Sequence, residues 1–137
     1  MKPGDVLTFS RCFTVEDVQL FTQLSSDEGD HHLTPDSDGR LLIHGLLTAS
    51  LPTRIGGLLN FWARDVNYRF LLPVFTGDTI TCSVEITSLE SHERGTALTA
   101  DYRCDNQHGD CVMDGCTKGI VHKTMEQMLE TPLPPVE

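Results

Sequence analysis

Long hydrophobic runs are absent from this chain of 137 residues. A membrane-spanning helix needs about 20 consecutive apolar residues, and no stretch of the sequence approaches that length. The first residues, Met1 to Asp5, are not followed by the apolar segment of a signal peptide. We therefore expect neither a membrane span nor a secretory signal.

Positive charge is scarce as well. The chain has 10 Lys and Arg against 20 Asp and Glu, a formal net charge of −10. Nucleic acids bind clustered cations, and no such cluster occurs, so nucleic acid is excluded as a partner. A phosphate-bearing ligand such as coenzyme A would need a local basic patch. The few cations that could supply it are Arg54, Arg64, Arg69, Lys118 and Lys123.

The cysteines are also not an even set that could all pair, because they number 5. An odd number without a secretory context indicates free thiols in a reducing compartment, and we predict a cytoplasmic protein. Cys104, His108, Cys111 and Cys116 have the residue types of a zinc site but lack the paired C-x2-C spacing. A hairpin would instead place Cys104 and Cys111 on facing strands with His108 in the turn. We predict no metal and no cofactor.

What the sequence does contain is an alternation of helical and strand patterns. Thr14 can cap a helix whose apolar residues recur at helical spacing from Val15 to Leu24. Residues 79–86 alternate with a period of two, which is typical of a half-buried strand. The order that we predict is strand 6–13, helix 14–24, loop 27–40, helix 41–60, and strands 65–75, 79–90, 94–104 and 110–122.

The segment 41–60 is apolar nearly all round and has no acidic residue. Such a helix should be buried, although Pro52 is expected to break or kink it. A strand, two helices and four further strands indicate an α+β fold, in which an antiparallel sheet curls around a central helix. We expect one domain over residues 1–123 and an extended or disordered tail over 124–137.

Three blocks of sequence resemble one family. They are Ser26–His32 (SDEGDHH), Ile43–Leu46 (IHGL) and Phe70–Asp78 (FLLPVFTGD). In this order and at these intervals, they are similar to the MaoC-like, (R)-specific enoyl-CoA hydratase family over roughly residues 4–123. The resemblance implies the hot-dog fold, a homodimer or a higher homo-oligomer, and an acyl thioester of coenzyme A or acyl carrier protein as substrate.

The resemblance also implies roles for particular residues. Asp27 and His32 match the family's catalytic pair, and Gly45 matches the glycine whose amide polarises the thioester carbonyl. Thr53 falls where relatives have a serine that helps to hold the aspartate. Among the substrate-binding candidates, His44 has a supporting role, and Arg64 and Arg69 could meet coenzyme A phosphates.

The first block departs from the family pattern. Gly29, Asp30 and His31 stand where relatives have asparagine, proline and an apolar residue. The charge of Asp30 would favour a protonated His32, and His31 could replace His32 if the loop shifts its register.

The predicted chemistry adds water to the double bond of a 2-enoyl thioester, or removes it from a 3-hydroxyacyl thioester. A histidine serves as a general base near neutral pH, a carboxylate can hold the water, and amides at a helix N-terminus can stabilise the enolate oxygen. The sequence does not decide which of Asp27 and His32 takes the first proton. Two alternatives stay open: a non-catalytic acyl-thioester-binding protein, and a thioesterase, which the acid-free segment 41–60 disfavours.

Overall fold

The computed structural model describes residues 1–122. The predicted tail 124–137 and the candidate cation Lys123 lie outside the described residues. The elements in chain order are β1 (Val6–Cys12), α1 (Val15–Ser25), α2 (Asp30–Leu33), α3 (Gly45–Leu58), β2 (Phe61–Phe70), β3 (Thr79–His92), β4 (Gly95–Asp105) and β5 (Cys111–His122).

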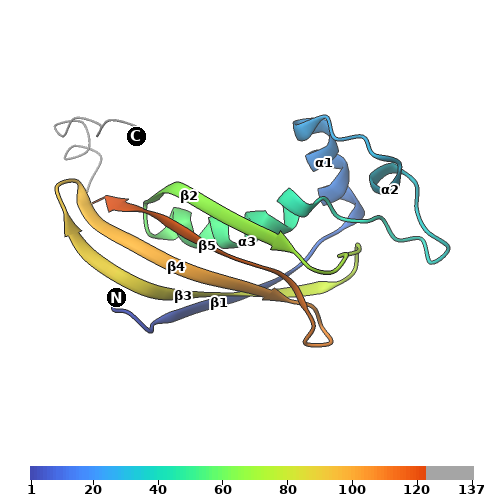
Figure 1. The fold of residues 1–137 in the computed structure, drawn as a ribbon. Coiled ribbons are helices and arrows are strands. Elements are labelled where there is room, and N and C mark those ends of the chain that lie inside the picture. The colour runs from blue at the N-terminus through green and yellow to red at the C-terminus, as the bar shows by residue number, and fades with distance from the viewer. Residues whose placement is uncertain (123–137) are drawn as a thin grey trace.

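The five strands form one antiparallel sheet in the order β1-β3-β4-β5-β2. The sheet is curved and α3 runs along its concave side, which confirms the hot-dog prediction (Figure 1). Alternate residues of β3, from Ile80 to Ile86, are buried against the helix, because neighbouring side chains of a strand point to opposite faces. β1 and β2 are the two edge strands.

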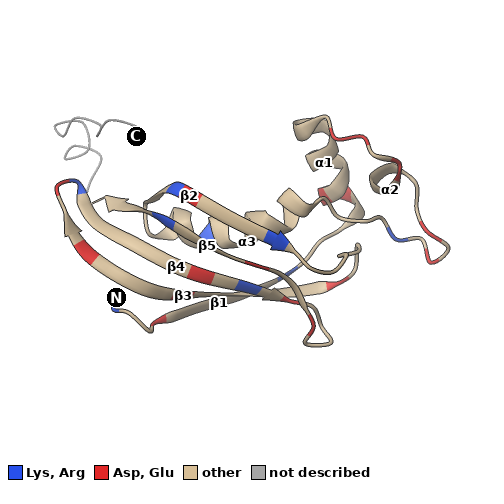
Figure 2. Ribbon diagram, in the orientation of Figure 1, with Lys and Arg blue, Asp and Glu red and all other residues tan. Residues whose placement is uncertain are grey.

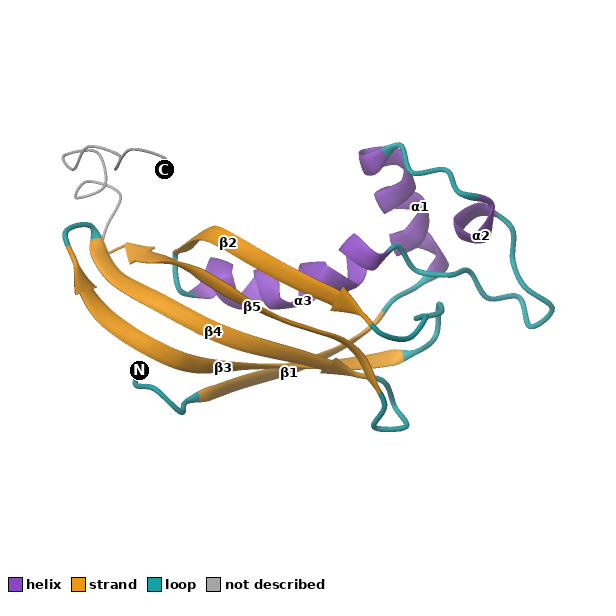
Figure 3. Ribbon diagram, in the orientation of Figure 1, coloured by secondary structure: helices purple, strands orange, loops and turns teal. Residues whose placement is uncertain are grey.

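The helix α1 begins with a capping box. The Thr14 hydroxyl accepts a hydrogen bond from the Asp17 amide (3.2 Å), and the Asp17 carboxylate accepts one from the Thr14 amide (2.9 Å). The second bond is the main reason why the pKa of Asp17 is lowered. α1 and α2 lie together at one end of the molecule, beyond the N-terminus of α3 (Figure 3). None of the helices in residues 1–122 combines the length and apolarity needed to cross a membrane.

The central helix is shorter than predicted. It begins at Gly45 rather than at residue 41, because Leu41–Ile43 is extended and bonded to the segment after β2. The amide of Ile43 donates to the carbonyl of Val74 (2.8 Å), and the amide of Thr76 donates to the carbonyl of Leu41 (2.9 Å). Pro52 lies inside α3 without ending it, since tertiary packing of the helix outweighs the loss of one donor.

Two further boundaries differ from the prediction. β2 begins at Phe61, has a bulge between Ala63 and Asp65, and ends at Phe70 instead of residue 75. Regular pairing ends there, because the amides of Leu71 and Leu72 share one acceptor on β5, the Val112 carbonyl. The loop predicted over 27–40 contains the single turn α2.

The turn Gly77–Asp78 ends this segment. Gly77 has a φ of 92°, a value that favours glycine. Asp78 accepts hydrogen bonds from the Phe75 amide (2.9 Å) and from the Gln107 side chain (2.8 Å). The turn therefore fixes where Val74 and Thr76 meet Leu41–Ile43.

Candidate active site

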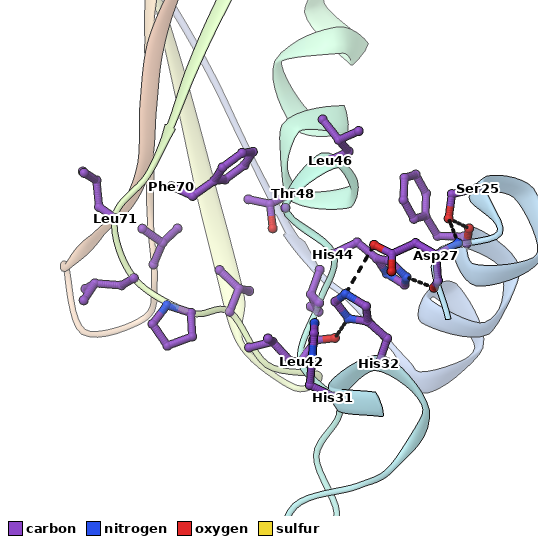
Figure 4. A pocket seen from close by; sticks show the side chains of 17 residues that line it. Ser25, Asp27, His31, His32, Leu42, His44, Leu46, Thr48, Phe70 and Leu71 are labelled. Carbon is purple, nitrogen blue, oxygen red and sulfur yellow. Dashed lines mark hydrogen bonds and ion pairs between the residues drawn. The ribbon is translucent and has the colours of Figure 1, made fainter. Parts of the chain in front are cut away.

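A pocket of about 710 Å³ opens at the N-terminal end of α3. Three segments line it: the end of α1 with the turn α2, the start of α3 with the residues before it, and the segment Phe70–Val74 (Figure 4). Most of the wall is apolar. Its ionisable groups are Asp27, His31, His32 and His44.

Asp27 and His32 face each other across the pocket. Oδ2 of Asp27 lies 3.6 Å from Nε2 of His32, whose side chain is only 6% exposed, whereas that of Asp27 is 54% exposed. The turn α2 produces this approach, because the His32 amide donates to the Gly29 carbonyl (2.8 Å). The Asp27 carboxylate accepts a bond from the Gly29 amide (3.3 Å). One residue of the pair is thus held inside the wall and the other reaches solvent.

The proton of the His32 ring is fixed by the main chain. Nδ1 lies 2.6 Å from the carbonyl oxygen of Leu42. A carbonyl oxygen only accepts, so Nδ1 carries a proton. In the neutral ring Nε2 therefore has the free electron pair, and it faces Asp27 and the pocket. This arrangement suits a general base.

His44 lies directly behind the pair. Its ring stacks on that of His32, with centroids 3.7 Å apart and planes 16° from parallel. Its Nε2 lies 3.1 Å from the carbonyl oxygen of Asp27 and 3.2 Å from the Thr22 hydroxyl. The side chain is 2% exposed, and this burial lowers the pKa of His44 below its usual value, with the neighbouring His32 and His31 acting in the same direction.

Gly45 is the first residue of α3 and lines the pocket. The first amides of a helix have no partner within it and carry partial positive charge. Among the hydrogen bonds of residues 1–122, none uses the amide of Gly45 or Leu46. A Cβ at position 45 would lie 2.9 Å from the ring of Phe70. Glycine thus allows the Phe70 ring to pack against the start of the helix, and no side chain at position 45 covers the free amides.

Asp27, His32 and His44 each place a ligand atom within 4.8 Å of the others, which is the spacing of a possible metal site. The nearly parallel stacking of the two rings opposes this use, because an imidazole binds a metal through a lone pair in its own plane. Parallel rings cannot both point at one ion between them.

Known proteins are similar to this chain both in sequence and in architecture. A mitochondrial 3-hydroxyacyl-(acyl-carrier-protein) dehydratase of Arabidopsis thaliana is 27% identical over 133 residues, which cover 88% of this chain and 78% of that protein. An (R)-specific enoyl-CoA hydratase of Aeromonas caviae is 30% identical over 113 residues, which cover 72% of this chain and 81% of the relative. This chain belongs to the (R)-specific enoyl-CoA hydratase family.

Solved structures of hydratases agree with this membership. An (R)-hydratase from Aeromonas caviae superposes with a TM-score of 0.78 at 28% identity, covering 88% of this chain and 97% of that one. An R-hydratase from Pseudomonas aeruginosa has a TM-score of 0.80 at 20% identity, covering 100% of this chain and 92% of its own, and supports the fold alone. No model of a protein family matches the chain.

The structure of this hydratase-family chain brings together only part of the predicted site. Asp27, His32, His44 and Gly45 share the pocket. Thr53 lies further along α3 and lines a second hollow of about 310 Å³ with Tyr68. Its hydroxyl donates to the Ala49 carbonyl (3.4 Å), and it makes no contact with Asp27.

Neither predicted arginine reaches the pocket of the same chain. Arg69 makes two hydrogen bonds to Asp114 (2.8 and 2.7 Å). It points to the convex face of the sheet, since its neighbour Phe70 packs on Gly45. Arg64 is exposed at the bulge of β2. The sequence suggested these residues by charge alone, which does not reveal the face of the sheet on which a side chain lies.

The mouth of the pocket is acidic. Asp27 lines the pocket and is followed in the sequence by Glu28 and Asp30, and Figure 2 shows further acidic residues along the loop after α2. Within this region Arg40 is bound to Asp36 (3.0 Å) and packs its guanidinium on Phe75. Across residues 1–122, no Lys or Arg lines the pocket.

The zinc alternative is not supported by the fold. Cys104 is buried and faces Met113 across the strands, while Cys111 faces Asp105. Cys104 and Cys111 therefore lie on facing strands, as predicted, and the register shift between Cys104 and Asp105 keeps them from being direct partners. His108 lies in the turn as predicted, and within the described part of the chain these residues form no metal-binding group.

Proposed function

We propose that this chain catalyses the (R)-specific hydration of 2-enoyl thioesters, or the reverse dehydration of 3-hydroxyacyl thioesters. One observation carries the proposal. The free Nε2 of His32 and the carboxylate of Asp27 face the same pocket as the unpartnered amide of Gly45. A base, a water-holding acid and an oxyanion donor are the three groups that hydration requires.

His32 acts as the base in the first half of the reaction. Nε2 takes a proton from a water held by Asp27 while the water oxygen forms a bond to C3. The electron pair of the C2–C3 double bond moves toward the thioester, and negative charge develops on its carbonyl oxygen. The Gly45 amide at the start of α3 donates to this oxygen. Losing such a donor costs about two to three orders of magnitude in rate.

The second half returns a proton to C2. Nε2 lies 3.6 Å from Asp27, so the proton that His32 took from the water passes through the Asp27 carboxylate to C2. The enolate then collapses to the thioester, and both catalytic groups regain their starting protonation. The Leu42 carbonyl keeps Nδ1 protonated throughout.

The acyl chain is proposed to extend along α3. Gly45, Pro52 and Gly56 fall on one side of this helix, and the second hollow begins at Pro52 and Thr53. Its walls are mainly apolar, which suits a hydrocarbon chain. In this proposal Thr53 binds substrate by lining the channel and does not hold Asp27.

Binding of the thioester's carrier, coenzyme A or acyl carrier protein, is proposed to need a second copy of the chain. β2 is an edge strand with an exposed backbone edge, and Trp62, Val66 and Phe70 on it are 49%, 44% and 53% exposed. Antiparallel pairing of two β2 strands about a twofold axis would place the start of one beside the end of the other. The partner's Arg64 would then lie near Phe70 and supply the cation that the acidic mouth lacks. Coenzyme A phosphates fit such a cation.

The cellular location is proposed to be the cytoplasm. All five cysteines are free thiols, which suits a reducing compartment. The relative from Arabidopsis thaliana is a mitochondrial protein by name.

A hydration assay tests the proposed function. Wild type, Asp27→Asn and His32→Ala are mixed with a short 2-enoyl-CoA, and the loss of enoyl absorbance is followed. We expect turnover by wild type and a fall of about three orders of magnitude or more in either variant, because each removes a group that acts on the water.

Asp38→Asn is the matched control. Asp38 is 74% exposed and paired only with Arg40, so wild-type turnover is expected. His31→Ala should also keep most activity, because His32 occupies the buried position beside Asp27. Undiminished turnover in both catalytic variants would refute the assignment of the pair. A folded wild type that binds enoyl thioesters without converting them would establish the binding-protein alternative, and release of free thiol would indicate a thioesterase.

A further inference from the structure

His44 contacts both members of the proposed catalytic pair, and it lies buried behind them. Its Nε2 reaches the main chain of Asp27, at 3.1 Å from the carbonyl oxygen. Its ring stacks on the ring of His32 with centroids 3.7 Å apart (Figure 4). It also contacts α1, through the Phe21 ring at 4.8 Å between centroids and the Thr22 hydroxyl at 3.2 Å from Nε2.

The acceptors around His44 fix its proton. The Asp27 carbonyl only accepts, so Nε2 must carry the hydrogen. In the neutral ring Nδ1 is then an acceptor, and it has no hydrogen-bond partner although the side chain is buried. An unsatisfied polar atom in the interior opposes folding. A phenylalanine ring would fill the same space without this penalty, so packing alone does not explain an imidazole at position 44.

We propose that His44 is a positioning residue, which holds the main chain of Asp27 through Nε2–H and supports the ring of His32 through its face. The inference rests on the proposed function, in which Asp27 and His32 activate one water. The chain folds so that a single buried ring sets the position of both groups. The two side chains also approach each other directly, to 3.6 Å.

His44 fulfils this role as a neutral ring. The titratable groups that face it are Asp27, His31 and His32, with Phe21 and Thr22 as the uncharged neighbours from α1. A neutral His44 keeps one proton, on Nε2, where the Asp27 carbonyl needs it. It also adds no positive charge beside His32, which has to accept a proton during the reaction.

Three substitutions separate the functions of the ring. His44→Gln places an amide N–H near the position of Nε2 and so keeps the donor to Asp27. His44→Asn carries the same amide on a shorter side chain, which ends near the position of Nδ1 and loses that donor. His44→Phe keeps the ring face against His32 and also loses the donor. Gln and Asn are a matched pair, because they differ in reach and not in chemistry.

Steady-state kinetics of the full-length chain with a 2-enoyl-CoA give the first readout. We expect kcat to fall about 10- to 100-fold in His44→Phe and His44→Asn, the cost of misplacing a reacting group by about 1 Å. KM should stay within about threefold, because substrate contacts are retained. His44→Gln should keep kcat within about fivefold of wild type. His108→Phe, in the β4–β5 turn, should behave as wild type.

Imidazole nitrogen NMR of His32 in the free protein gives a second readout that needs no activity. All four proteins should keep the proton on Nδ1, because the Leu42 carbonyl holds it. The Nε2 resonance should be the same in wild type and His44→Gln, and it should shift in His44→Phe and His44→Asn, where Asp27 beside Nε2 loses its main-chain donor. The proposal is overturned if the His32 spectra are the same in all four proteins. It is also overturned if Gln and Asn have equal kcat, or if kcat falls only in proportion to the folded fraction measured by circular dichroism. A wild type without hydratase activity refutes the proposed function, and the spectra then decide the role of His44 independently.

Discussion

At the scale of single residues, the site depends on hydrogen atoms fixed by main-chain carbonyls. The Leu42 carbonyl holds the proton on Nδ1 of His32, and the Asp27 carbonyl holds the proton on Nε2 of His44. Each carbonyl thereby selects one of two tautomers, and the free nitrogen of His32 faces Asp27 and the pocket whereas that of His44 is buried. In the proposed reaction, this selection is the reason for assigning the base to His32.

Gly45→Ala tests the space at the start of α3. The new Cβ would meet the Phe70 ring at 2.9 Å, and that ring is half exposed and can turn aside. We expect the free energy of unfolding to change by less than about 1 kcal/mol, while kcat/KM falls about 100-fold because the thioester carbonyl is displaced from the amide. Thermal unfolding and hydration kinetics measure the two effects.

Ser50→Ala is the control for this substitution, because Ser50 is exposed in the same helix and lies outside the pocket. It should leave both quantities near their wild-type values. A Gly45→Ala protein with wild-type kcat/KM would exclude close approach of the substrate to this backbone position.

At the scale of elements, α1 supports the site although it lies far from His44 in the sequence. Phe21 and Thr22, near its C-terminal end, contact the His44 ring, and Ser25 and Phe21 line the pocket. The capping box at Thr14 therefore stabilises one wall of the site.

Thr14→Ala should lower the free energy of unfolding by about 1 kcal/mol, because it removes the acceptor for the Asp17 amide. Thr14→Ser keeps that acceptor and should lie close to wild type. Urea unfolding monitored by circular dichroism compares the three proteins, and equal stability of all three would show that the cap is not needed.

Asp17 gives the same cap a dependence on pH. Its pKa in the folded protein is lowered from 3.8, mainly by the Thr14 amide and also by Arg11. A lowered pKa means that the stabilisation is present above pH 3.8 and is lost as the pH falls through the folded value. Asp17→Asn should therefore be less stable than wild type at neutral pH, and this difference should shrink in acid.

Much of the element order could be predicted from the sequence, and its failures have physical causes. Alternation in β3 and the turns at Gly77 and Asn106 defined the last three strands within a few residues. The turn α2 was missed because its four residues are too short to show a helical period. The start of α3 was missed because Leu41–Ile43 is apolar whether it is helical or, as here, bonded to Val74 and Thr76.

The site was predicted less completely than the fold. The residue types and spacing of Asp27, His32 and Gly45 carried the resemblance, and the structure places them together. The stacking and tautomer of His44 could not be predicted, because they depend on atoms from α1 and from the loop before α2. Arg69 could not be excluded either, since only the strand register shows that it faces Asp114.

At the scale of the whole molecule, the net charge and the edge strand β2 are the basis of the proposed dimer. The formal net charge of −10 and the acidic mouth oppose a phosphate-bearing substrate. The exposed apolar residues of β2 and its free backbone edge offer a way to bring in a partner's cation. The monomer would then have the chemical groups but only part of the binding site.

Val66→Lys should dissociate the proposed dimer, because it places a charge in the middle of the β2 edge, where the partner strand would pack. Sedimentation should show a monomer, and KM for an enoyl-CoA should rise. Val6→Lys, on the opposite edge strand β1, is the matched control and should remain dimeric. Arg64→Ala should keep the dimer and raise KM for enoyl-CoA but not for a phosphate-free enoyl-pantetheine. A wild type that sediments as a monomer contradicts the proposal.

The segment Leu41–Ile43 has a consequence for how such a protein can change over evolution or be redesigned. Its Leu42 carbonyl sets the proton of His32, while Val74 and Thr76, from the Pro-Val-x-x-Gly-Asp block, hold the segment in place. Residues 73–78, which are typical of the fold, thus affect the proposed acid–base chemistry through Leu41–Ile43. The two blocks cannot be inherited or transplanted separately: a catalytic loop moved into another scaffold would need residues 41–44 and 73–78 to travel with it.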